Sequence, residues 1–265
     1  MRSYLFVPGD STGKLAKGLG CGADALLLDL EDSVAPAAKP EARRIVAGFL
    51  EREREKADRP RLIVRINSRD TGMWDADLDW VVPARPDGLL VPKARSGADI
   101  AALSADLEAR ERRLGLKSGG ISLFALVTEV AVSLLDMKSY IGASPRLSAL
   151  TWGAEDLLAD IGGLANRDER GAFTSPYRLA RDLTLYAAAA AGLAAIDTVF
   201  VDIKDTEGLR AECRAAVRDG FSGKMAIHPA QVPIINEVFT PSVQEVARAR
   251  RIVDYFAANP QAGVV

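Results

Sequence analysis

Eight short apolar runs recur along the chain, and they constrain the fold more than any other feature of the sequence. Each run is continuous rather than alternating in polarity, which is typical of strands that are buried on both faces of a parallel sheet. The runs occupy residues 4–7, 25–30, 62–66, 88–91, 121–127, 147–152, 198–203 and 224–227.

Amphipathic segments separate these runs and predict helices at residues 39–56, 97–113, 176–195, 206–218 and 243–258. Ser175 is the expected N-cap of the third of these helices, with Pro176 in its first turn. Eight strands alternating with helices over 265 residues predict an α/β fold, a (β/α)8 TIM barrel, with an open doubly wound sheet as the alternative. No segment reads as an interdomain linker, so we expect one barrel domain over residues 1–265, in which 241–265 form a C-terminal helix and tail.

The charge balance and the scarcity of two residue types limit the possible functions. The chain has 34 Lys+Arg against 36 Asp+Glu, and this near-zero balance argues against a nucleic-acid surface. Cys21 and Cys213 are too few for a disulfide framework, so we expect a cytoplasmic protein. His228 is the single histidine, which excludes sites with two His ligands. We expect no targeting segment and no membrane span, because the longest apolar stretch, 183–196, is shorter than about 18 residues and reads as a buried helix.

Polar side chains stand where most of the apolar runs end. In a (β/α)8 barrel the active site lies at the C-terminal ends of the strands, so these side chains are expected to converge there. Helix caps explain some of them, but they explain Arg65, Lys93 and Glu129 poorly. In chain order the set is Asp10, Ser11, Asp29, Glu31, Asp32, Arg65, Asn67, Lys93, Glu129, Glu155, Asp156, Asp202, Lys204 and His228.

Glu129 and Asp156 follow consecutive strands and are therefore expected to be neighbours in space. Two carboxylates with few other protein ligands suit Mg²⁺, which prefers oxygen and keeps several waters. Zinc or iron would usually bring histidines. The alternative is that one of the two carboxylates forms a structural ion pair with Arg65 or Lys93, and the spacing leaves both interpretations open.

Arg65 lies inside the strand segment RLIVRIN, where a buried charge is costly without a partner. Its planar guanidinium suits bidentate binding of a substrate carboxylate. The alternative is an internal salt bridge to Asp29 or Glu31. We favour the ligand role, because a ligand and these acids can share one network.

Two glycine-rich segments imitate nucleotide-binding motifs. GDSTGK at 9–14 is one residue short of P-loop glycine spacing, and Leu15 replaces the hydroxyl residue that would bind Mg²⁺, so we exclude nucleotide hydrolysis. The turn with Lys14 and Lys17 still suits less specific phosphate binding. GLGCGA at 18–23 precedes a strand, whereas the dinucleotide fingerprint follows one, and we interpret it as a helix end with a left-handed glycine.

His228, at the end of the last run, is either a general acid/base or a core-facing, hydrogen-bonded structural residue. We favour the structural role.

Several separate segments, in order over residues 2–236, resemble the citrate lyase beta-subunit-like lyases of the HpcH/HpaI aldolase superfamily. They are SYLFVPGDS, ADALLLDLEDSVAP, RIN, VPKARS, the Glu of VTE, TWGAEDL and GKMAIHPAQV. The resemblance implies a (β/α)8 barrel that assembles as a homotrimer or hexamer. It also implies Mg²⁺-dependent cleavage or formation of a carbon–carbon bond, with a CoA thioester and a 2-oxo acid as partners and no nucleic acid or membrane.

The resemblance also implies roles for single residues. Glu129 and Asp156 match the Mg²⁺ ligands, so that Glu129 belongs to both the metal site and the catalytic, substrate-binding site. Arg65 matches the arginine that binds the 2-oxo-acid carboxylate. Asp29 and Glu31 match the acidic strand end beside it, and either is a candidate for the base that takes the hydroxyl proton.

The first loop, with Lys14 and Lys17, is similar to the region that binds CoA. One departure concerns the C-terminus, where longer relatives carry a lid with an acidic residue and this chain shows no such segment after the last helix. The chain therefore resembles the short, stand-alone proteins of the family. Thioester hydrolysis, a CoA-independent 2-oxo-acid aldolase and a non-catalytic metabolite-binding protein remain as alternative functions.

Overall fold

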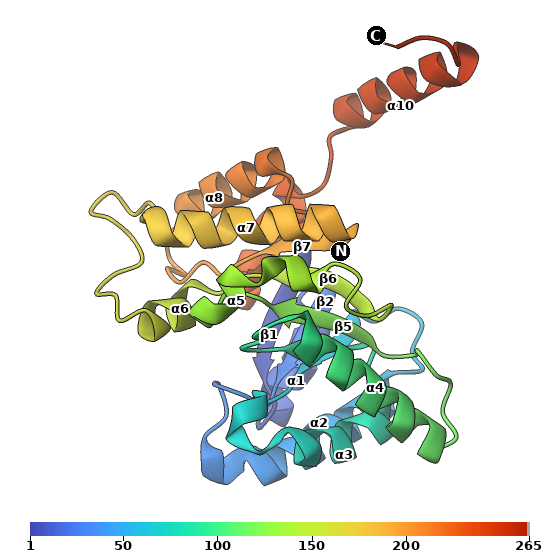
Figure 1. The fold of residues 1–265 in the computed structure, drawn as a ribbon, viewed down its shortest axis with the longest axis vertical. Helices are drawn as coiled ribbons and strands as arrows, with labels where there is room; N and C mark the ends of the chain where they lie inside the picture. The colour runs from blue at the N-terminus through green and yellow to red at the C-terminus, as the bar shows by residue number, and fades with distance from the viewer. Residues whose placement is uncertain (264–265) are drawn as a thin grey trace.

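A computed structural model describes residues 1–263 and shows a closed barrel of eight parallel strands in the order β1 to β8 (Figure 1). The strands are β1 (Ser3–Pro8), β2 (Ala25–Asp29), β3 (Arg61–Arg65), β4 (Gly88–Val91), β5 (Ser122–Leu126), β6 (Leu147–Thr151), β7 (Ala194–Asp197) and β8 (Gly223–Ala226). Pairing of β8 with β1 closes the sheet, which confirms the predicted (β/α)8 barrel and excludes the open sheet.

Helices follow the strands and, except for the last, cover the outside of the barrel. They are α1 (Thr12–Leu19), α2 (Lys39–Glu53), α3 (Trp74–Ala84), α4 (Gly97–Arg113), α5 (Ala131–Leu135), α6 (Ala154–Asp160), α7 (Ser175–Ala191), α8 (Thr206–Asp219), α9 (Val232–Val238) and α10 (Val243–Ala258). Short 3-10 helices lie at Pro36–Ala38, Arg69–Thr71, Met137–Tyr140 and Pro229–Gln231. Within residues 1–263 no helix is long and apolar enough to cross a membrane.

Apolar side chains form two layers, one inside the barrel and one between barrel and helices. The inner cluster takes at least one residue from every strand, including Tyr4, Leu27, Ile63, Leu90, Phe124, Ala149, Ile196 and Met225. The larger outer cluster packs alternate strand residues against the helices. Because successive side chains of a strand point to opposite faces, a strand buried on both faces reads as a continuous apolar run.

The seventh strand was predicted in the wrong place. Residues 198–204 form an irregular loop in which Asp202 and Lys204 are exposed, and the strand is instead β7, which overlaps the end of the predicted helix 176–195. Gly192, with φ of 67°, ends α7 in the left-handed conformation, and the alanine-rich sequence then continues as the strand. α7 also begins one residue earlier than expected, so that Thr174 rather than Ser175 is its N-cap. The helix was expected to be buried, but it is buried on one face only, and Tyr186 is exposed.

One glycine shapes the turn before α1, and another shapes the segment after α1. A Cβ on Gly9 would lie 2.6 Å from the carbonyl oxygen of Asp29, so this turn can pack against β2 only with glycine. Ser11 caps α1 by accepting the backbone N–H of Lys14. The left-handed glycine of the segment after α1 is Gly22, with φ of 79°, whereas the capping residue Gly20 has φ of −93°.

The last helix, α10, extends away from the barrel (Figure 1). Its Ser242–Glu245 capping box defines its start, and none of its residues is buried.

Candidate active site

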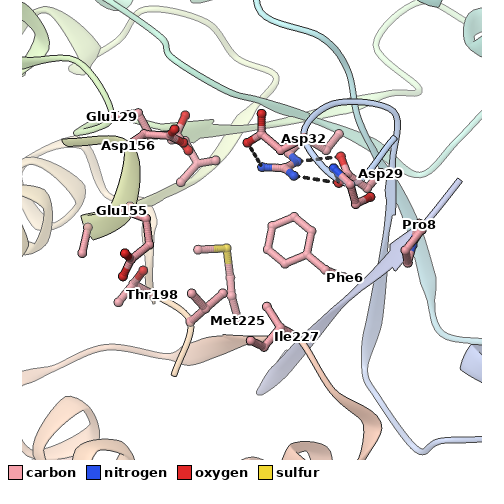
Figure 2. Close-up of a pocket in the computed structure, with 16 residues that line it drawn as sticks. Phe6, Pro8, Asp29, Asp32, Glu129, Glu155, Asp156, Thr198, Met225 and Ile227 are labelled. Atoms are coloured by element: carbon pink, nitrogen blue, oxygen red, sulfur yellow. Dashed lines mark hydrogen bonds and ion pairs between the residues drawn. The ribbon is translucent and has the colours of Figure 1, made fainter. Parts of the chain in front are cut away.

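A cavity of about 420 Å³ opens at the C-terminal ends of the barrel strands (Figure 2). Asp29 ends β2 and Arg65 ends β3, and the two residues are paired in the sheet register. Glu129 follows β5, and Asp156 lies in the first turn of α6, directly after β6. All four of these predicted site residues line the cavity.

Arg65 is held by Asp29. Its Nε and Nη2 each donate to one carboxylate oxygen of Asp29 at 2.7 Å, and its guanidinium lies 4.8 Å from the ring centroid of Phe6. The backbone N–H groups of Glu31 and Ser33 also donate to Asp29. Burial alone would raise the pKa of Asp29, but the hydrogen bonds and charge of Arg65 hold this pKa below its ordinary value. The Arg65 salt bridge that was the alternative to ligand binding is therefore present, and it fixes the guanidinium at the cavity wall.

The remaining edge of Arg65 faces two more carboxylates. Its Nη1 lies 3.1 Å from Glu31 Oε2 and 3.4 Å from Asp32 Oδ2. Glu31 Oε2 is buried and has no hydrogen-bond partner within the described chain, since its contact with Nη1 lacks hydrogen-bond geometry. Burial raises the pKa of Glu31 to about 7, although the charges of Arg65 and Lys93 oppose this rise.

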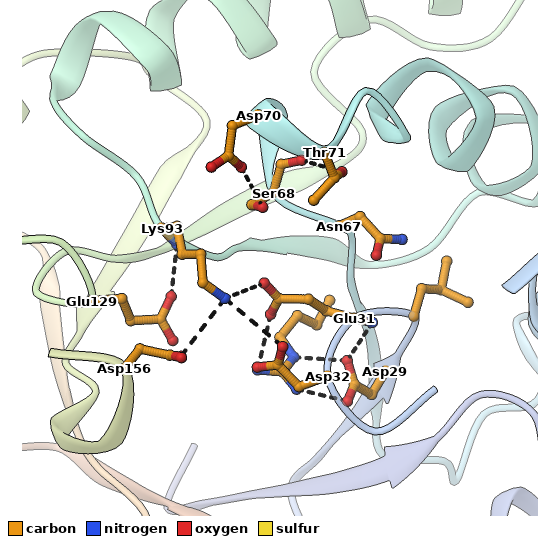
Figure 3. Close-up of polar contacts among 12 residues, drawn as sticks. Asp29, Glu31, Asp32, Asn67, Ser68, Asp70, Thr71, Lys93, Glu129 and Asp156 are labelled. Carbon is orange, nitrogen blue, oxygen red and sulfur yellow. Dashed lines mark hydrogen bonds and ion pairs between the residues drawn. The ribbon is translucent and has the colours of Figure 1, made fainter. Parts of the chain in front are cut away.

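Lys93 connects the acidic groups from the other side (Figure 3). Its Nζ donates to Glu31 Oε1 at 2.7 Å and lies 3.8 Å from both Asp32 Oδ1 and Asp156 Oδ2. Its backbone is left-handed, with φ of 50°, a conformation that is uncommon for residues other than glycine. The backbone N–H of Lys93 donates to Glu129 Oε2 at 2.7 Å, so this conformation orients Glu129.

Glu129 is a buried carboxylate without a cationic side chain in salt-bridge contact among residues 1–263. Burial raises its pKa well above the ordinary value, and the charges of Glu31 and Asp156 raise it further, against the opposing charges of Arg65 and Lys93. Gly153 packs on it so closely that a Cβ there would lie 3.0 Å from Glu129 Cγ.

The site has the donor chemistry of a Mg²⁺ site. The carboxylates of Glu129 and Asp156 lie next to each other in Figures 2 and 3. Burial is the main cause of the raised pKa of Glu129 and the charge of Asp156 adds to it, so a dication between the two carboxylates would favour the charged form of Glu129. Over residues 1–263, no three His, Cys, Asp or Glu side chains are arranged to bind a metal, which fits an ion that takes its other ligands from water and substrate.

Of the other predicted residues, Asp32 and Glu155 also line the cavity, whereas Glu31 contacts Arg65 and Lys93 without lining it, and Lys14, Lys17 and His228 do not line it either. Lys14 and Lys17 are exposed on α1 and do not line the cavity. His228 is also exposed, and its Nδ1 accepts the backbone N–H of Ala230, so it caps the 3-10 helix Pro229–Gln231. This histidine is hydrogen-bonded, as expected, but it does not face the core.

Sequence reasoning did not assign a functional role to three features of the site. Lys93 was noted only as a possible ion-pair partner, and Asp32 only as a possible helix cap, although both stand at strand ends. The apolar side of the cavity was not foreseen at all. It is formed by Phe6, Leu126, Val199, Met225 and Ile227, and its position depends on which side chains of each strand face inward, which follows from the closed register.

Comparisons with known proteins agree with this geometry. The family model described as HpcH/HpaI aldolase/citrate lyase matches residues 2–229. A (3S)-malyl-CoA thioesterase of Cereibacter sphaeroides is 38% identical over 96% of this chain and 82% of its own length. An L-malyl-CoA/beta-methylmalyl-CoA lyase of the same species is 36% identical over 95% of this chain and 83% of its own length.

A solved structure shows the same fold. The citrate lyase beta subunit from Mycobacterium tuberculosis, complexed with oxaloacetate and magnesium, superimposes with a TM-score of 0.76 at 34% identity. The match covers 90% of this chain and 96% of that one.

Proposed function

Because the chain belongs to the HpcH/HpaI aldolase/citrate lyase family, we propose that it is a Mg²⁺-dependent carbon–carbon lyase. It cleaves or forms a 3-hydroxyacyl-CoA thioester, with a 2-oxo acid and an acyl-CoA as the other side of the reaction. The observation that carries this proposal is the convergence of Arg65, Glu129 and Asp156 on one cavity at the C-terminal ends of the strands.

Glu129 and Asp156 would hold the Mg²⁺ ion. When bound, Mg²⁺ acts as a Lewis acid for the substrate oxygen on which charge develops. The Lys93 N–H and the packing of Gly153 orient Glu129 before the ion arrives. Such orientation limits the reorganisation that binding requires.

Arg65 would bind and orient the carboxylate of the 2-oxo acid, while Asp29 holds its guanidinium in place. During cleavage the hydroxyl proton passes to a base, and the C–O bond becomes the ketone. The electron pair of the breaking C–C bond goes to the thioester enolate, which is then protonated to the acyl-CoA. Holding the carboxylate fixes the direction of the bond that breaks.

Of the two candidate bases, we favour Glu31 over Asp29. Both oxygens of Asp29 accept hydrogen bonds, and its pKa is lowered, so it is a poor proton acceptor near neutral pH. Glu31 has one oxygen without a hydrogen bond and a pKa raised to about 7. A base with a pKa near the working pH is the more effective.

Lys14 and Lys17 would bind the CoA phosphates at the start of α1. They stand three positions apart and so share one helical face, and both are exposed toward solvent. We also propose that residues 1–265 act as one domain in a cytoplasmic homotrimer or hexamer. The unburied apolar residues of α10, among them Val246 and Val253, support the assembly.

Thioester hydrolysis at the same site is the second candidate, because a relative at 38% identity is a (3S)-malyl-CoA thioesterase. Incubating the protein with Mg²⁺, acetyl-CoA and a panel of 2-oxo acids separates the two activities. The lyase is expected to form a new hydroxyacyl thioester without releasing free thiol. Free thiol without a new carbon–carbon bond would assign the thioesterase, and no change with any acid would contradict the lyase.

A further inference from the structure

We propose that Thr128 is a positioning residue of the metal site, and that it sets the spacing between the two carboxylates that hold Mg²⁺. Its hydroxyl group joins the turn that carries Glu129 to the turn that carries Asp156. Thr128 itself does not line the cavity, and the proposal rests on the Mg²⁺ site of the proposed function.

The backbone ladder between β5 and β6 ends just before the metal site. Leu126 and Thr151 are the last paired residues, and the N–H of Val127 still donates to the carbonyl oxygen of Thr151 at 2.9 Å. Within residues 1–263, no backbone hydrogen bond beyond this point joins the two segments. Glu129 and Asp156 both lie beyond it, so the backbone ladder alone does not fix the distance between their carboxylates.

The side chain of Thr128 continues this ladder by one more pair. Its Oγ1 accepts the backbone N–H of Gly153 at 2.9 Å and donates to the carbonyl oxygen of Gly153 at 3.2 Å. A hydroxyl can act as donor and acceptor at once, so one side chain binds both polar groups of the same residue. Thr128 is fully buried, and both bonds are therefore shielded from water.

Gly153 lies between Thr128 and both metal ligands. It is the N-cap of α6, and Asp156 lies in the first turn of that helix. A Cβ on Gly153 would lie 3.0 Å from Glu129 Cγ and 3.2 Å from Glu129 Oε1, so the backbone of Gly153 packs directly on the Glu129 side chain. Fixing Gly153 therefore fixes the start of α6 against Glu129.

The other side of the same turn is anchored independently of Thr128. Trp152 is fully buried, and its Nε1 donates to Asp197 Oδ1, at the end of β7, at 2.8 Å. Because this anchor remains, loss of the Thr128 hydroxyl should leave the barrel folded. It should change mainly how Gly153 and Glu129 lie against each other.

The binding of Mn²⁺ to the whole protein tests this role without turnover. Mn²⁺ prefers the same oxygen ligands as Mg²⁺, and free Mn²⁺ is measured directly by electron paramagnetic resonance. Thr128→Val keeps nearly the same shape and removes the hydroxyl, and it should bind Mn²⁺ about tenfold or more weakly than the wild type, because groups that orient metal ligands contribute that much to affinity. Thr128→Ser keeps the hydroxyl and should bind with close to wild-type affinity. Competition by Mg²⁺ should give the same ranking.

Two further variants make the comparison specific. Thr184→Val is the matched control, because Thr184 is also fully buried and its hydroxyl donates to the carbonyl oxygen of Ala180 within α7, away from the cavity. In EDTA its melting temperature should fall by about 1–6 °C, like that of Thr128→Val, while its Mn²⁺ affinity stays unchanged. Asp156→Asn should abolish the binding, which assigns the signal to this site.

The outcomes separate this role from the proposed function. Wild-type Mn²⁺ affinity in folded Thr128→Val, or equal weakening in Thr128→Ser or in Thr184→Val, would overturn the role of the hydroxyl and leave the Mg²⁺ site standing. If Thr128→Val does not fold, Thr128→Ala compared with Thr128→Ser isolates the hydroxyl in the same way, and equal affinity of these two would overturn the role. Failure of the wild type to bind Mn²⁺ or Mg²⁺ would overturn the proposed function, and the role of Thr128 with it.

Discussion

Arg65→Lys is the substitution whose consequences the structure defines most sharply. Asp29 accepts two hydrogen bonds from the Arg65 fork, each at 2.7 Å, and both side chains are buried. Lysine keeps the charge but can reproduce only one of these two bonds. A hydrogen bond to a charged group contributes about 1.5–3 kcal/mol, so the free energy of unfolding should fall by about that amount.

This loss should be visible as a change in melting temperature. A chain of this size loses about 2–4 °C per kcal/mol, which gives a fall of about 3–12 °C. The affinity for a 2-oxo acid in Mg²⁺ should also fall about tenfold or more, because the bidentate edge is lost. Without the structure, the same substitution would be expected to leave thermal stability little changed.

Calorimetric melting and titration with pyruvate measure the two effects on the same samples. Arg61→Lys is the matched control, since Arg61 lies at the opposite end of β3, is half-exposed and is 3.9 Å from Asp87. This control should change neither quantity appreciably. A wild-type melting temperature for Arg65→Lys would refute the energetic role of the Arg65–Asp29 pair. Unchanged pyruvate affinity with a lowered melting temperature would make Arg65 purely structural.

Three further predictions follow from other parts of the molecule. Asp156→Asn should keep the fold, because Asp156 is partly exposed, but should lose Mg²⁺ binding in a calorimetric titration; unfolding of this variant would mean that Asp156 is structural. Replacing both Lys14 and Lys17 by alanine should raise the KM for the CoA thioester and reduce its salt dependence, with the KM for the 2-oxo acid unchanged; normal thioester binding at low salt would place CoA elsewhere. Burial raises the pKa of Asp197, but the charges of Lys224 and Arg181 and the hydrogen bonds from Lys224 and Trp152 together outweigh burial and lower this pKa. The contribution of Asp197 to stability is therefore present above the unfolded pKa of about 3.9 and is lost as pH falls through the lower folded pKa. Urea unfolding between neutral and acidic pH should show this loss, and Asp197→Asn should make the acid slope shallower; an identical slope would contradict the assignment.

Much of the barrel could be predicted from the sequence because its strands are buried on both faces. Residues 88–91 were predicted with the same bounds as β4, and α4 and α10 also match residue by residue. β7 was missed because its sequence, AAID, continues an alanine-rich helix and carries little β-branched character. The β-branched segment at 198–203 attracted the assignment instead, although it lies in the loop after the strand.

For the site, only the identity of several of its residues could be predicted from the sequence. Charged residues at strand ends identified Arg65, Glu129 and Asp156, because the carboxyl ends of parallel strands meet on one face. The partners of each charge could not be predicted in the same way. That Asp29 takes both arms of Arg65 depends on sheet register, and that Lys93 orients Glu129 depends on a backbone N–H and a left-handed φ, for which the sequence carries no pattern.

Product analysis after cleavage of a one-carboxylate hydroxyacyl thioester, malyl-CoA, tests the central claim most directly. With Mg²⁺ present, the protein should release glyoxylate and acetyl-CoA in equal amounts, detected by mass spectrometry, and EDTA should abolish the reaction. Asp156→Asn should produce neither product while remaining folded. Release of malate and free CoA would instead assign a thioesterase, and full cleavage in chelator would contradict the Mg²⁺ site at Glu129 and Asp156.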